Sequence, residues 1–158
     1  MKTSTLFSYI HNEIFGAELL EKANTIDINA NGIQIEGSEE VKKIALGVSC
    51  NAEFLQKATN WKADVCIFHH GLGLSNHYIY NSRLTPSIQK QLAIAFKHNL
   101  TIAGYHYALD THGRIGNNAQ ITKALHAKDT KEYYFDGWGT VAEFSKSQFI
   151  QDVAKDCM

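Results

Sequence analysis

Two adjacent histidines, His69 and His70, follow directly on an apolar run at 64–68. Such a run is typical of a strand that is covered on both faces. In open α/β sheets, ligands bind beyond the carboxyl ends of the strands, so the pair lies where a site is expected. Neighbouring residues on an ideal strand point to opposite faces, but Gly71 lets the chain leave strand geometry at this point. Both imidazoles could therefore serve one site.

A second group of candidate residues follows the next apolar run, 100–104. It contains His106, Asp110 and His112. Imidazoles together with a carboxylate suit Zn²⁺, Mn²⁺, Fe²⁺ or Ni²⁺. A carboxylate can also bridge two metals about 3.5 Å apart, which activates water at neutral pH. The spacing leaves two interpretations: a metal site at two neighbouring strand ends, or histidines that act as hydrogen-bonded loop residues.

The chain has eight histidines, and only part of this excess lies at the two strand ends. We expect His11, His98 and His126 to lie on helices as surface or half-buried residues. His77 is compatible with either role.

Other catalytic patterns are weak. The chain has no Walker A sequence, and the glycines at 71 and 73 lack the third glycine and the helix start of a dinucleotide fingerprint. Cys50 follows a strand and could be a nucleophile, although a small buried hydrophobe is the better interpretation. Ser75 lies near His77 but lacks the context of a nucleophile elbow.

The framework that positions these residues is predicted from apolar periodicity. Three- and four-residue steps predict a helix from Ser4 to Ala23, and period-two alternation predicts a strand at 32–37. Further strands are predicted at 43–48, 64–68, 100–104, 133–135 and 140–144. Further helices are predicted at 51–61, 86–99 and 117–126, and after a cap at Ser145 through Val153. Loops are predicted at 71–82 and 105–116. This alternation predicts an α/β fold with a mostly parallel sheet flanked by helices.

Composition narrows the class of protein. The 158 residues suit one domain, with 44% hydrophobic residues and a net charge of −1. Only two of the fifteen basic residues are arginine, which argues against nucleic-acid binding. Three cysteines without a CxxC pair favour a reducing, cytoplasmic location. We see no signal peptide and no apolar run long enough to span a membrane, so no membrane association is expected.

Three segments carry a resemblance to a known family: 31–37 (NGIQIEG), 63–71 (ADVCIFHHG) and 104–120 (GYHYALDTHGRIGNNAQ). They resemble the Nif-three-like dinuclear-metal proteins, whose members are often labelled type 2 GTP cyclohydrolase I homologues. The resemblance covers nearly the whole chain, in the correct order. It implies two divalent metal ions, with His69, His70 and Asp110 as ligands.

The resemblance also raises the question of length. The family's remaining ligands lie in a Gly-His-x-x-Thr-Glu segment of a C-terminal half, and this sequence has no such segment. We therefore expect residues 1–158 to form a single Nif-three-like N-terminal α/β lobe, with the C-terminal lobe of the family absent.

Three hypotheses about function follow. The first is a metal-dependent hydrolase-like protein in which activated water attacks an electrophilic carbon or phosphorus of an unknown small molecule, with His106 or His112 as acid/base or outer-shell partner. The second is a non-enzymatic metal-binding or regulatory protein that acts as a homo-oligomer, since the resemblance implies hexameric rings. The third is a truncated, inactive member with an exposed apolar surface.

Overall fold

Strands β1 (Gly32–Ile35), β2 (Ile44–Ser49), β3 (Val65–His70) and β4 (Thr101–Gly104) form one sheet in the order β1-β4-β3-β2. The computed structural model of the chain describes residues 1–27, 30–73 and 84–156. β2, β3 and β4 run parallel to one another, and β1 pairs antiparallel with β4. The predicted α/β fold with a mostly parallel sheet is therefore confirmed.

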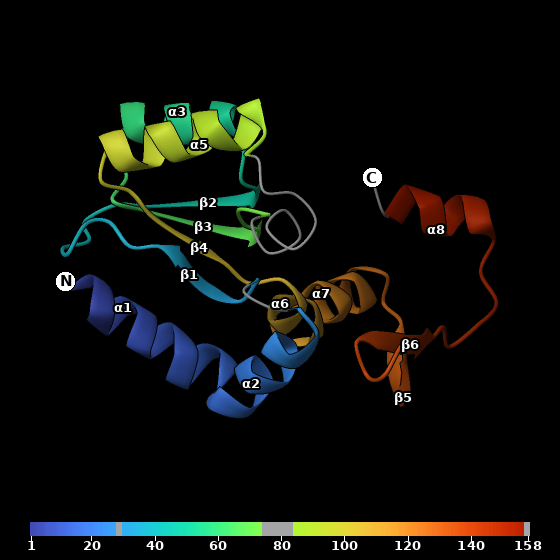
Figure 1. Cartoon of the computed structure of the whole chain (residues 1–158). Helices are drawn as coiled ribbons and strands as arrows, with labels where there is room; N and C mark the ends of the chain where they lie inside the picture. The colour runs from blue at the N-terminus through green and yellow to red at the C-terminus, as the bar shows by residue number, and fades with distance from the viewer. Residues whose placement is uncertain (28–29, 74–83, 157–158) are drawn as a thin grey trace. The chain divides into compact units, whose positions relative to one another are not determined.

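Helices cover both faces of this sheet. α3 (Ala52–Asn60) and α5 (Pro86–Lys97) lie on one face, where they connect the parallel strands (Figure 1). α1 (Thr3–Tyr9), the π-helix η1 (Ile10–Phe15) and α2 (Ala17–Ile26) lie on the other face. Asn51 and Thr85 cap α3 and α5 by accepting backbone N–H bonds, and Pro86 takes the first position of α5.

The core lies between the sheet and the α3–α5 layer. Its fully buried side chains include Leu55, Cys66, Leu100 and Ile102, with Phe68 only 2% exposed. Phe54 packs edge-on against Phe68, with ring centroids 4.9 Å apart. This apolar layer holds β3 and β4 in register up to the residues at their carboxyl ends.

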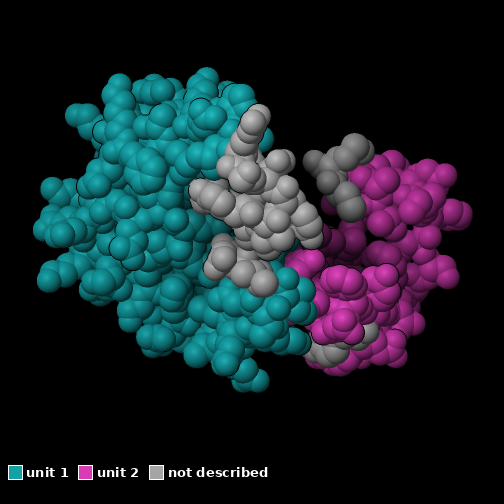
Figure 2. Space-filling view, in the orientation of Figure 1, with its two compact units in different colours: residues 1–106 teal, residues 107–158 magenta. Residues whose placement is uncertain are grey.

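Residues 1–106 and 107–158 form two compact units (Figure 2). The second unit contains α6 (Tyr107–Thr111), α7 (Asn117–Ala124), β5 (Lys128–Tyr134), β6 (Gly139–Glu143) and α8 (Ile150–Asp156). β5 and β6 form an antiparallel two-stranded sheet of their own. Trp138, buried in this unit, stacks on Tyr107 with centroids 5.1 Å apart. The prediction that residues 1–158 form a single N-terminal lobe, with the family's C-terminal lobe absent, stays a prediction.

Several element boundaries differ from prediction. The helix predicted over 4–23 is interrupted at Gly16, which has φ +78°, so the chain changes direction there. The short helix α6 lies inside the predicted loop 105–116. The strand predicted at 133–135 is longer in the structure. β5 begins at Lys128, because pairing with β6 extends it over polar residues. The last helix begins at Ile150 and has no cap at Ser145. Most of the predicted loop 71–82 lies outside the described residues.

Candidate metal centre

The carboxyl ends of β3 and β4 lie side by side. Phe68 and Gly104 are register partners, and the Tyr105 N–H donates to the Phe68 carbonyl at 2.9 Å. His69 follows Phe68 directly and His106 lies two residues after Gly104, so both emerge at the same edge of the sheet. β2 lies on the other side of β3, with Ser49 opposite His70. The predicted meeting of two histidine-bearing strand ends is confirmed for these residues.

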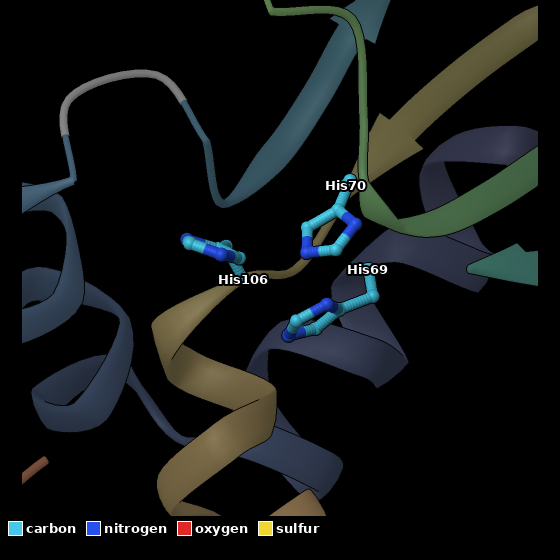
Figure 3. Close-up of side chains that lie close together, drawn as sticks. All are labelled: His69, His70 and His106. Carbon is cyan, nitrogen blue, oxygen red and sulfur yellow. The ribbon is translucent and has the colours of Figure 1, made fainter. Parts of the chain in front are cut away.

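Three imidazoles gather at this edge (Figure 3). One possible ligand atom from each of His69, His70 and His106 lies within 4.8 Å of the other two. Their ring centroids are 4.4 Å apart for His69–His70, 4.8 Å for His69–His106 and 5.3 Å for His70–His106. With Zn–N distances of about 2.0–2.1 Å, such a group needs only modest side-chain adjustment to hold one ion. We call these three residues the histidine cluster.

A side-chain bridge from β1 holds the chain just after the histidine pair. The Gln34 amide accepts from the Leu72 N–H at 2.7 Å and donates to the Leu72 carbonyl at 3.3 Å. A Cβ added at Gly71 would collide with the Gln34 amide oxygen. A glycine at 71 therefore leaves room for the bridge that holds the chain as it leaves β3.

His106 and His70 each have a partner at Nδ1. The Asp27 carboxylate lies 2.6 Å from His106 Nδ1, and the His106 backbone N–H donates to the Asn31 side chain at 2.8 Å. The Ser49 hydroxyl lies 3.0 Å from His70 Nδ1. A ring bonded through Nδ1 presents Nε2 as its other nitrogen, and such outer partners are typical of metal-binding histidines. The donor set fits a divalent transition metal.

Tyr105, the residue before His106, is held by side chains of the π-helix η1. Tyr105 is buried, stacks on Phe15 at 4.6 Å, and its hydroxyl lies 2.8 Å from His11 Nε2. Burial raises the pKa of Tyr105, and desolvation lowers the pKa of His11. His11 is thus half-buried on a helix, as expected.

Asp110 and His112 belong to the second unit and are described there. Asp110 lies on α6, and the Asn117 amide donates to its Oδ1 at 2.6 Å. His112 Nδ1 accepts the backbone N–H groups of Arg114 and Ile115 at 3.2 and 3.3 Å. A neutral His112 ring with these two contacts carries its proton on Nε2. The roles of both residues stay predictions.

The alternative sites are less favoured. Burial, and secondarily Cys66, raise the pKa of the Cys50 thiol to about 12, which opposes formation of a nucleophilic thiolate. His98 and His126 are exposed, as expected for surface residues. His77 and Ser75 lie outside the described residues.

Sequence reasoning missed the residues that support the cluster: Asp27, Asn31, Gln34 and Ser49. Asn31 and Gln34 lie in the 31–37 segment, which the sequence predicts to contain a strand and which carries the family resemblance, but which is not predicted to belong to a site. Asp27 and Ser49 had no signal, because each meets its histidine only through folding, across 79 and 21 positions.

The site and the fold together define an open-sheet α/β protein with a histidine cluster at the carboxyl edge of its parallel strands. The family model described as Duf34/NIF3 (NGG1p interacting factor 3) matches residues 11–158. The chain belongs to this family, and the expected resemblance is confirmed.

Individual relatives agree. A GTP cyclohydrolase 1 type 2 homolog of Buchnera aphidicola is 38% identical over 120 residues, which cover 75% of this chain and 46% of the relative. One from Archaeoglobus fulgidus is 34% identical over 119 residues, covering 73% and 46%. HcgD from Methanocaldococcus jannaschii shares the fold, with a TM-score of 0.77 at 21% identity over 99% of this chain and 58% of that one. The chain thus spans about half the length of the curated relatives it matches.

Within the described part of the chain, every helix is too short or too polar to cross a bilayer.

Proposed function

We propose that this chain carries a divalent-metal site of a metal-dependent, hydrolase-like protein. The observation that carries the proposal is the gathering of three imidazoles, His69, His70 and His106, within 4.8 Å. Two of them are ligands that the family resemblance implies, and the geometry adds His106. Asp110 is proposed as a further ligand on the resemblance alone.

The donor set bears on how many ions are bound. Three imidazoles match the protein ligands of a catalytic zinc site, which keeps one position open. A second ion needs more donors than the histidine cluster has, and Asp110 and water are the candidates. We therefore propose one ion at the histidine cluster and a second that depends on Asp110. Zn, Fe, Mn and Ni all suit such ligands.

The chemistry follows from these groups. A divalent ion, when bound, supplies a Lewis acid that activates water for attack on an electrophilic carbon or phosphorus. Within the chain, Asp27 and Ser49 orient two of the imidazoles. We propose His112 as the acid/base group because an imidazole exchanges protons near neutral pH. The substrate is proposed to be a small molecule. A cytoplasmic location and a homo-oligomeric ring also stay predictions.

Metal content tests the site directly. Purified protein is incubated with zinc, desalted and measured by elemental analysis, for the wild type, His70→Ala and His106→Ala. We expect the wild type to retain zinc and both variants to lose most of it. His98→Ala is the matched control, because His98 is an exposed histidine at the C-cap of α5. Equal zinc in the wild type and both variants would overturn the ligand assignment.

Turnover tests the hydrolase part separately. A panel of nucleotides and phosphate esters is incubated with the zinc-loaded protein, with a chelator, and with the chelator followed by added metal. Activity that disappears with the chelator and returns with metal supports the proposal. Zinc retention without any turnover contradicts the enzyme and favours a metal-binding scaffold.

A further inference from the structure

We infer that Asp27 is a positioning residue, which holds the His106 ring so that Nε2, not Nδ1, is the nitrogen offered to a metal. The inference rests on the proposed metal site and deepens it. Asp27 is not among the residues that the sequence or the family resemblance assigned to the site. It closes the last turn of α2, on the opposite side of the sheet from α3 and α5.

The contact between Asp27 and His106 determines which ring nitrogen carries the proton. Asp27 Oδ2 lies 2.6 Å from His106 Nδ1. An ionised carboxylate only accepts hydrogen bonds, so the proton must be on Nδ1. In a neutral ring the lone pair is then on Nε2. Because a metal binds an unprotonated nitrogen, Asp27 selects the ligand atom of His106.

The same segment also holds the backbone of His106. The His106 N–H donates to the Asn31 Oδ1 at 2.8 Å, and Asn31 is only 8% exposed. Asp27 therefore holds the ring of His106, and Asn31 holds its main chain. The side chains of His106 and Asp27 are 30% and 21% exposed, so their hydrogen bond is partly shielded from water and from salt. A histidine held at its ring and at its main chain loses less freedom when it binds a metal.

The other outer contact of the cluster does not have this effect. The Ser49 hydroxyl, 3.0 Å from His70 Nδ1, can donate or accept a hydrogen bond. It is therefore compatible with either neutral form of His70. Only the Asp27 carboxylate therefore selects one protonated form of its histidine ring.

Zinc affinity gives the first test, by titration against a chromophoric chelator with the full chain. We expect Asp27→Ala to weaken zinc binding by about 10- to 100-fold, the usual effect of removing an outer partner. Asp27→Asn should lose less, because its side-chain carbonyl can still accept from Nδ1. Glu21→Ala is the control, since Glu21 is an exposed carboxylate on the same helix, and its affinity should match the wild type.

The protonated nitrogen gives a second test, which a merely structural role of Asp27 would not move. Long-range ¹H–¹⁵N NMR of the metal-free protein at about pH 8, above the ordinary histidine pKa, reports which ring nitrogen bears the proton. We expect Nδ1–H for His106 in the wild type and a mixture in Asp27→Ala. Circular dichroism checks that each variant is folded. If Asp27→Ala does not fold, the wild-type spectrum alone still shows whether His106 carries its proton on Nδ1.

The outcomes separate the two proposals. Zinc binding by the wild type with equal affinity in Asp27→Ala overturns this inference and leaves the metal site standing. An Nε2–H form of His106 in the wild type also overturns it. A wild type that binds no zinc overturns the proposed metal site, and the inference with it. Weaker zinc binding together with a redistributed proton supports the positioning role.

Discussion

Single side chains at the candidate centre depend on partners that are distant in sequence. His106 is held by Asp27 and Asn31, and His70 by Ser49. The residue types at positions 69, 70 and 106 were evident from sequence, whereas the groups that orient them were not.

Another residue-scale feature is a buried thiol. Cys66 is fully buried on β3, and burial raises its pKa from 9.0 to about 11. The folded state thus keeps the proton at a pH where the unfolded state has lost it. The unfolded state is then favoured, so the stability of the protein should fall as the pH rises from about 9 to about 11.

The expected slope for this one group is at most about 1.4 kcal/mol per pH unit. Urea unfolding at several pH values, for the wild type and Cys66→Ala, measures it. Because other titrating groups are common to both proteins, the wild type should lose stability more steeply than the variant. Parallel pH profiles would show that the buried thiol contributes nothing.

At the scale of elements, β1 does more than close the edge of the sheet. Its Gln34 side chain bonds both main-chain polar groups of Leu72, just past the end of β3. A missing side chain at Gly71 leaves space for that bridge. The sequence predicts that Gly71 lets the chain leave strand geometry after the histidine pair, and the structure shows that it also makes room for the Gln34 side chain.

A double-mutant cycle tests the bridge. Gln34→Ala and Gly71→Ala should each destabilise the fold by about 1–3 kcal/mol, because each leaves Leu72 without the Gln34 amide. The double variant should cost less than the sum, by about 0.5–3 kcal/mol, since the same bridge cannot be lost twice. Chemical unfolding of the four proteins gives these values. Gly73→Ala is the control, because an added Cβ there meets nothing within 4 Å; additive costs would refute the shared bridge.

At the scale of the whole molecule, β2 is the exposed edge of the four-stranded sheet. Leu46 and Val48 lie on one face of this strand and are 73% and 68% exposed, while Ala45 packs on the core from the other face. An apolar strand at a sheet edge is a site of association. The chain spans about half the length of the curated relatives it matches.

Self-association measures the consequence of this edge. In sedimentation velocity over a concentration series, the wild type should sediment faster as concentration rises, because molecules meet through β2. Leu46→Lys with Val48→Lys should reduce the change. Phe96→Lys replaces a residue that is 66% exposed on α5, away from any strand edge, and should leave the association intact. A wild-type coefficient that does not change with concentration would contradict the prediction.

The sequence by itself determined the α/β class, most helices and strands, the family, and the two strand ends at which histidines gather. These properties are local, since apolar periodicity, caps and short motifs are written in neighbouring residues. Only the tertiary structure decided that His106 lies with His69 and His70 and that the first helix is interrupted at Gly16. It also decided that Asp27 contacts the His106 ring. The contacts at His106 depend on strand register and on side chains brought together across 79 positions, which no local pattern encodes.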